Sequence, residues 1–138
     1  MFKTRYFKIE ELVHPQLIRD MGEVNCWRRL DEGCLRELDL IRELWDDEIY
    51  INWGNADSRG LRPPDDSDGA FYSVHKQGKA FDIVPGNGDV VRLWNFIYSL
   101  IESGTLSCFN TIESLVHTPS WVHIASMNTS EKPLVINP

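Results

Sequence analysis

The chain has 138 residues, which is the length of one domain with its own hydrophobic core. Apolar residues make up 42% and charged residues 25%, so the composition is that of a globular protein and excludes a disordered or fibrous one. The net charge of −7 argues against nucleic-acid binding, which needs a surplus of Lys and Arg, and it also disfavours anionic membranes. We therefore treat residues 1–138 as a single domain that has no nucleic-acid or membrane partner.

The N-terminus and the cysteines indicate the compartment. No run approaches the roughly 18 consecutive apolar residues that span a bilayer, and the first twelve residues are too polar for a secretory signal. We expect the protein to be cytoplasmic when synthesised. Cys26, Cys34 and Cys108 form no C-x-x-C pair, so we expect them to be reduced and structural.

Two segments have the apolar periodicity of amphipathic helices. In residues 31–46, apolar side chains recur at helical spacing behind Asp31, which can cap the first turn. Residues 90–101 form one apolar stripe between a capping Asp89 and Gly104, which offers a C-terminal stop. Both segments predict helices that cover a core.

Strands are predicted at residues 49–53, 79–84, 108–116 and 121–126, the last two joined by a hairpin loop at 117–120. Residues 54–71 are too rich in Gly, Pro and Asp for regular structure, and loops of that length are usually functional. The pattern predicts an α+β fold: a small antiparallel sheet with amphipathic helices on one face and a zinc cleft on the other.

Three side chains are candidate metal ligands. Alternation along 79–84 places Asp82 on the face opposite the core, and 121–126 does the same for His123. Gly78 allows the chain to bend and bring His75 to that face. Two imidazoles and one carboxylate form a catalytic zinc set that leaves a fourth position for water. A histidine is more often structural than ligating, so spacing alone leaves both interpretations open.

The residues around these ligands resemble a known family. Ser73 to Asp82 reads S-x-H-x-x-G-x-A-x-D, which resembles the signature of D-alanyl-D-alanine dipeptidases and carboxypeptidases. Their fold is shared by the hedgehog signalling domain and phage L-alanyl-D-glutamate endopeptidases. Trp121-Val122-His123 is similar to the W-x-H strand that supplies the third ligand, and Gly60-Leu61-Arg62 to a G-x-R element. The resemblance covers residues 49–126, and residues 6–12 look like the start of small phage-encoded relatives.

This resemblance implies a zinc peptidase that hydrolyses bonds next to D-amino acids in peptidoglycan stem peptides, in the manner of a carboxypeptidase or an endolysin. It would act at the bacterial cell wall after lysis or from a virion. Arg62 would stabilise the oxyanion or orient the substrate, and Arg59 competes for that role. Ser73 would support the ligands through a hydrogen bond. The alternative is a catalytically degenerate zinc-containing relative that binds cell-wall peptide or other virion proteins.

The general base is the point at which the resemblance fails. The family has Glu or Asp three residues before the last histidine ligand, and this chain has Ser120. Glu113 is the candidate replacement: a loop at 117–119 would place it across from His123, whereas a four-residue loop would turn it away. His117 is the second candidate, as an acid or a substrate contact. Trp121 is assigned to substrate contact or support of the ligands.

Tryptophan residues in and beside the predicted elements have two interpretations. Trp53, Trp94 and Trp121 could form a platform that stacks on sugars, but Trp94 belongs to the apolar stripe and Trp53 ends a predicted strand. Core packing is the favoured interpretation.

Overall fold

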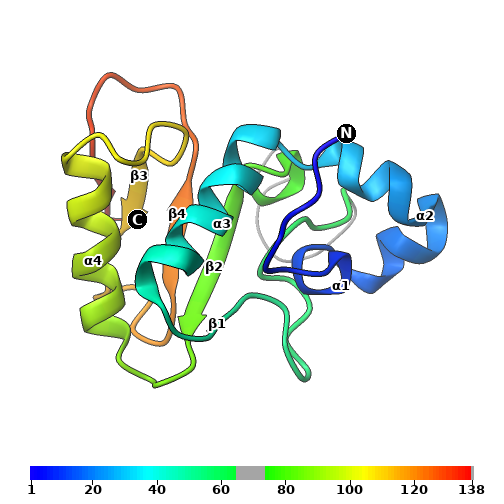
Figure 1. Ribbon diagram of the computed structural model, residues 1–138, viewed down its shortest axis with the longest axis horizontal. Helices are drawn as coiled ribbons and strands as arrows, with labels where there is room; N and C mark the ends of the chain where they lie inside the picture. Colours follow the sequence, from blue (N-terminus) through cyan, green and yellow to red (C-terminus); the bar gives the residue numbers. More distant parts are fainter. Residues whose placement is uncertain (65–73, 138) are drawn as a thin grey trace.

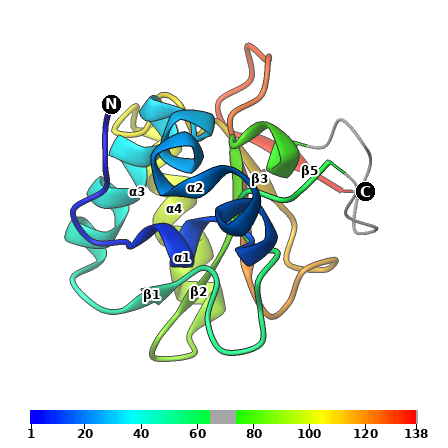
Figure 2. The same ribbon diagram turned by 90° about the vertical axis from the view of Figure 1, so that its right-hand side faces the viewer.

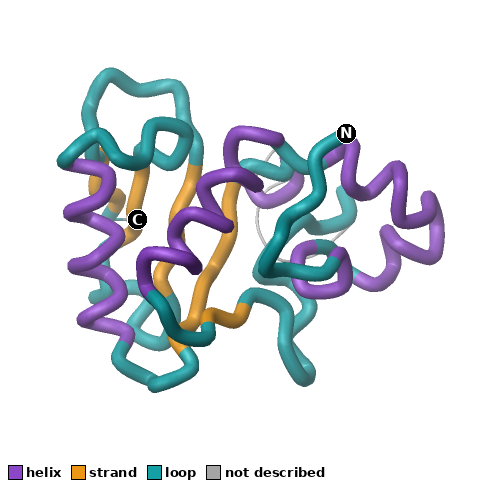
Figure 3. Tube along the Cα trace, in the orientation of Figure 1, coloured by secondary structure: helices purple, strands orange, loops and turns teal. Residues whose placement is uncertain are grey.

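The apolar patterns build one sheet with helices packed against it. The computed structural model describes residues 1–64 and 74–137. The helices of these residues are α1 (Ile9–Leu12), α2 (Pro15–Arg29), α3 (Glu32–Trp45), α4 (Val90–Glu102) and the 3-10 helix η1 (Val74–Gln77). The strands are β1 (Ile49–Tyr50), β2 (Ala80–Pro85), β3 (Thr111–Glu113), β4 (Val122–Ala125) and β5 (Leu134–Ile136). Figures 1 and 3 show their arrangement. In this part of the chain, no helix is long and apolar enough to cross a membrane.

Both predicted amphipathic helices are confirmed, together with their caps. The Asp31 carboxylate accepts a hydrogen bond from the Cys34 N–H at 2.9 Å, and Asp46 ends α3 in a left-handed conformation. At α4, the Asp89 carboxylate accepts from the Arg92 N–H at 3.0 Å. Each cap satisfies a backbone donor that the first helical turn leaves without a partner.

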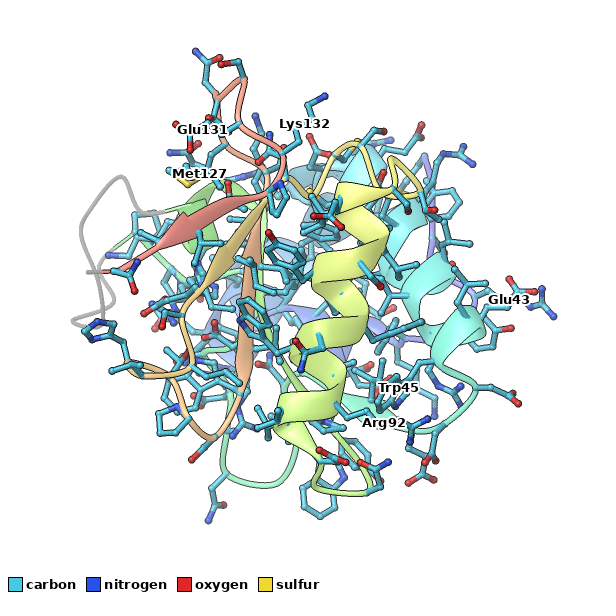
Figure 4. All side chains as sticks on the ribbon, turned by 90° about the vertical axis from the view of Figure 1, so that its left-hand side faces the viewer. Glu43, Trp45, Arg92, Met127, Glu131 and Lys132 are labelled. Carbon is cyan, nitrogen blue, oxygen red and sulfur yellow. The ribbon has the colours of Figure 1, made fainter. Side chains whose placement is uncertain are left out.

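The core lies between these two helices and the sheet. Figure 4 shows α3 and α4 on the same side of the sheet, and the rings of Trp45 and Phe96 join them at a centroid distance of 5.3 Å. Buried Phe81, Ile112 and Ile124 supply the apolar face of the sheet. The helices α1 and α2 pack together at one end of the molecule (Figures 1 and 2).

The prediction of a wholly antiparallel sheet is wrong. The strand order in the described residues is β1-β2-β4-β3-β5, and β5 pairs with β3 in parallel, with Thr111 opposite Leu134 and Glu113 opposite Ile136. The parallel pair follows from the connection: β5 reverses direction relative to β4, and β4 is itself antiparallel to β3. The sheet is therefore mixed, within an α+β fold.

The prediction that Trp53 packs in the core is also wrong. The expected strand at 49–53 pairs only over Ile49–Tyr50, after which the backbones of Trp53 and Ala56 hydrogen-bond to each other in a tight turn. This turn leaves the Trp53 side chain 63% exposed. Trp94 behaves as predicted and packs against the core.

A buried carboxylate on α3 organises the segment that leads into β3. Glu37 accepts hydrogen bonds from the backbone N–H groups of Ser107, Cys108 and Phe109 at 2.8 to 3.0 Å. We expect Glu37→Gln to lower the free energy of unfolding by ~2–4 kcal/mol, because these are charge-assisted bonds and the amide nitrogen cannot accept them. Urea denaturation measures the loss.

The matched control for this prediction is Glu43→Gln, an exposed position on the same helix (Figure 4). It makes the same chemical change and should leave stability within ~0.5 kcal/mol of the parent. Equal effects at the two positions would show that Glu37 does not hold the 107–109 segment.

Candidate metal centre

Two of the predicted ligands face each other across neighbouring strands. The antiparallel register of β2 and β4 places Asp82 opposite His123. Their neighbours Phe81 and Ile124 point into the core, so alternation turns Asp82 and His123 to the other face. The His123 Nδ1 atom lies 2.7 Å from Asp82 Oδ1.

The third predicted ligand comes from η1, which enters β2 through a glycine turn. Gly78 has a φ of +72°, and a Cβ atom there would lie 2.6 Å from the Arg29 carbonyl oxygen. Only glycine fits this close approach without strain. The turn brings His75 Nε2 to 3.4 Å from Asp82 Oδ1, with the His75 and His123 rings 5.1 Å apart.

These three residues form a group that could hold a metal ion. One ligand atom from each of His75, Asp82 and His123 lies within 4.8 Å of the other two. Within residues 1–64 and 74–137, no other His, Cys, Asp or Glu belongs to such a group. The described residues thus offer an ion three ligands, which is the number in catalytic zinc sites that keep a position for water.

A backbone carbonyl orients the His75 ring. The His75 Nδ1 atom lies 3.2 Å from the Gly60 carbonyl oxygen, which only accepts, so Nδ1 carries a hydrogen and donates. In the neutral ring, Nε2 then presents a lone pair to the Asp82 carboxylate. His75 Nε2 and Asp82 Oδ1 are then two acceptor atoms that face each other 3.4 Å apart. A proton or a metal ion between them would be stabilised, so the pair fits a bound cation.

The carbonyl is in place because residue 60 is glycine. A Cβ atom there would lie 2.0 Å from the Leu12 carbonyl oxygen. Any larger residue would push this segment away from Leu12, and the acceptor for His75 would move with it.

Arg62 holds the other oxygen of the same carboxylate. Its Nη2 atom lies 3.5 Å from Asp82 Oδ2, and its Nε donates to the Ser58 carbonyl at 2.5 Å. Asp82 therefore directs Oδ1 to the histidines and Oδ2 to the arginine. Burial alone would raise the pKa of Asp82, but its interactions with His123 and His75 outweigh it, and the pKa lies well below its usual range. The carboxylate is ionised, as a metal ligand must be.

A cleft of about 360 Å³ opens beside Asp82. It is lined by Asn55, Ala56, Asp57, Ser58, Arg59, Arg62, Asp82 and Trp121. Both candidate arginines and Trp121 therefore line it, and the Arg62 guanidinium lies 3.5 Å from the Asp82 carboxylate. The Asp82 N–H donates to the Arg59 carbonyl at 2.8 Å, so the wall of the cleft is joined to β2 at the ligand itself.

The register of β3 and β4 places Glu113 on the face of the sheet that carries the ligands. Thr111 pairs with Ala125 and Ile112 with Ile124, so the next pair in the same register is Glu113 and His123. Ile112 points into the core, and Glu113 therefore points to the side of His123. The Glu113 carbonyl accepts from Trp94 Nε1 at 2.8 Å, which fixes this end of β3 to α4.

The remaining predicted site residues are less closely placed. His117 and Ser120 are both exposed in the segment between β3 and β4. This segment leaves the sheet at Ser114, which makes it longer than the expected hairpin loop. Ser73 lies outside the described residues.

Sequence reasoning missed the cleft wall at Asn55–Asp57 and the carbonyl that orients His75. In the sequence Gly60 has a place only in the G-x-R element, although a glycine is also a signal of close backbone approach. The wall has no such signal, because its position depends on how the whole 54–62 segment packs.

Comparisons with known proteins add no relative. No protein-family model matches the chain, and the searches of curated proteins and of solved structures returned no match. A proposal of function therefore depends on the geometry of the candidate metal centre and on the motif of residues 73–82.

The turn at Gly78 gives a stability prediction. Gly78→Ala should destabilise the protein by more than the ~1–2 kcal/mol that a left-handed backbone costs an L-residue, because the new methyl also meets the Arg29 carbonyl. Chemical denaturation measures the change. Gly88→Ala is the control, since Gly88 has a φ of +79° and open space where its Cβ would stand. Equal losses at both positions would mean that the close approach to Arg29 is unimportant.

Proposed function

We propose that this protein is a zinc-dependent peptidase that hydrolyses peptide bonds next to D-amino acids in peptidoglycan stem peptides. The observation that carries the proposal is the group of His75, Asp82 and His123 at the side of a cleft that Arg62 and Trp121 line. The resemblance of residues 73–82 to the D-alanyl-D-alanine peptidase signature supports the substrate class and a hedgehog/DD-peptidase-like fold.

Zinc is the ion that best fits the donors. Two imidazole nitrogens and one carboxylate oxygen make a borderline-soft set, whereas calcium and magnesium prefer oxygen ligands alone. Zinc held in this way supplies Lewis acidity and lowers the pKa of a coordinated water to about 7.

The chain's own side chains perform the remaining tasks. Glu113, beside His123 in the sheet register, takes the proton from the attacking water and returns it to the leaving amine. Arg62 faces the cleft and Asp82 together, so it keeps the ligand carboxylate in place and presents positive charge to the carbonyl oxygen of the substrate. Trp121 forms an apolar wall for the peptide. His117 is close to these elements in sequence and serves as a substrate contact.

The site of action in this proposal is the bacterial cell wall, which the protein reaches after lysis or from a virion. Its partner is the peptidoglycan peptide. The competing function is non-catalytic binding of cell-wall peptide or of other virion proteins, and Ser120 favours it because serine replaces the expected carboxylate.

The test is release of new amino groups from purified peptidoglycan by the zinc-loaded protein, with bound zinc counted in parallel. We expect stoichiometric zinc and release that a chelator abolishes and added zinc restores. Bound zinc without release from several types of cell wall would reject the peptidase and favour the non-catalytic function.

A further inference from the structure

The strand that carries Glu113 ends at that residue. The last pair between β3 and β4 joins Ile112 to Ile124, so Glu113 lies one residue beyond it. After Glu113 the chain leaves the sheet, and it returns at Val122, where β4 begins. Pairing with β4 therefore sets the face to which Glu113 points, but it does not hold the end of the strand in place.

One peptide group, between Glu113 and Ser114, is held from both sides. Its N–H belongs to Ser114 and donates to the Ile136 carbonyl of β5 at 2.9 Å. Its C=O belongs to Glu113 and accepts from Trp94 Nε1 at 2.8 Å. In a planar trans peptide the N–H and the C=O point in opposite directions. The edge strand β5 thus fixes one side of this peptide group, and α4 fixes the other through Trp94.

The Trp94 indole is itself fixed in orientation. Its ring stacks on that of Tyr98, one turn further along α4, with a centroid distance of 5.3 Å and an interplanar angle of 18°. It also packs against the core. The indole has a single donor, which lies in the plane of a rigid ring, so the packing that fixes the ring also directs the N–H.

Side-chain packing alone does not hold the chain after Glu113. A hollow of about 270 Å³ lies between α4 and this segment, and it is lined by Val91, Trp94, Asn95, Ser114, Leu115 and Val116. The Val116 side chain is 84% exposed. Because the hollow leaves room for the segment to move, the hydrogen bond from Trp94 is the contact between α4 and the strand end that restricts Glu113.

We propose that Trp94 is the positioning residue for Glu113, and that its hydrogen bond keeps the Glu113 carboxylate beside His123 and the metal centre. The Glu113 carbonyl carbon and its side chain share one Cα atom, so rotation of the peptide group displaces the carboxylate. Trp94 acts through Glu113 and does not touch the substrate. The inference rests on the proposed function, in which Glu113 is the general base, and it adds a residue from the helix on the opposite side of the sheet.

Trp94→Phe removes the donor and keeps an aromatic ring beside Tyr98. With the zinc-loaded protein on purified peptidoglycan, kcat should fall roughly 10- to 100-fold, the effect of a small displacement of a catalytic group. KM and zinc content should not change. Benzothienylalanine at position 94 replaces only the N–H by sulfur and should give the same loss, which keeps the test valid if the smaller Phe ring disturbs the fold.

Trp45→Phe is the matched control. Trp45 lies on the neighbouring helix α3 (Figure 4), and within the described residues its Nε1 has no hydrogen-bond partner, so this change removes an indole N–H but no bond. It should keep the parental kcat. In a Glu113→Gln background, Trp94→Phe should lower kcat by less than ~2-fold more, since residues that act through one another are not additive. Parental kcat in Trp94→Phe, or an equal loss in both backgrounds, would overturn the inference and leave the peptidase intact.

A spectroscopic measurement decides the matter if the parent protein hydrolyses nothing. The ¹³C resonance of the Glu113 carboxyl group should move when zinc is added to the parent and to Trp45→Phe, because the carboxylate lies beside the metal centre. It should move much less in Trp94→Phe. This pattern without hydrolysis supports the positioning role, although the peptidase proposal fails. The same displacement in all three proteins, or none in the parent, rejects the positioning role.

Discussion

In the proposed zinc peptidase, replacing Asp82 with asparagine should remove both the bound zinc and the activity. The substitution takes away a charged ligand whose Oδ1 lies between two imidazoles, and it leaves Arg62 beside a neutral amide. Loss of an outer-shell partner alone typically costs roughly 10- to 100-fold in metal affinity, and we expect loss of this ligand to exceed that range. Competition with a chromophoric chelator measures the affinity, and release of amino groups from peptidoglycan measures the activity.

The control for this result is Asp20→Asn, which removes the same charge from the exposed side of α2. It should bind one zinc ion with the affinity of the parent. Near-UV circular dichroism distinguishes loss of the metal from loss of the fold. A folded Asp82→Asn protein with the parental zinc affinity would contradict the assignment of these three ligands.

Glu113→Gln should lower kcat by roughly 10²- to 10⁴-fold, the usual contribution of a general base, while zinc stays bound. The metal should remain because Glu113 is not one of the three residues in the ligand group. The amide keeps the shape of the side chain but cannot take a proton from water. Turnover at saturating substrate, with zinc content measured on the same sample, tests this expectation.

Glu131→Gln is the matched control, because Glu131 is exposed in the loop between β4 and β5, which projects from the sheet in Figure 4. This variant should be fully active. Unchanged turnover of the Glu113→Gln protein with zinc retained would remove Glu113 from the mechanism and direct attention to His117.

The elements predicted well from sequence were those whose signals are local. Helices α3 and α4 have caps and continuous apolar stripes, and both are where the pattern placed them. Helix α2 lacks this clarity, because Gly22 adopts a non-helical conformation inside it and breaks the periodicity. Strand β5 has three residues, and its partner β3 lies more than twenty residues earlier, so no local pattern predicts the pairing.

The same distinction applies to the site. The three candidate ligands were recognisable because two of them alternate with core residues on short strands and the third precedes a glycine turn. The face of Glu113 depended on a register that the sequence left open, and the pairing of Ile112 with Ile124 decides it. The exposure of Trp53 was not predictable, since it follows from a turn in which the backbones of Trp53 and Ala56 hydrogen-bond to each other.

The hydrogen bond from the Asp82 N–H to the Arg59 carbonyl joins the cleft wall to β2 through the main chain. Together with the contact between Gly60 and His75, it fixes the frame of the cleft wall by main-chain atoms. Side chains at Asn55, Ala56 and Asp57 can therefore be exchanged without displacing the ligands. In the proposed peptidase, selection for a new peptide would act on these positions first, and the three candidate ligands would be inherited unchanged.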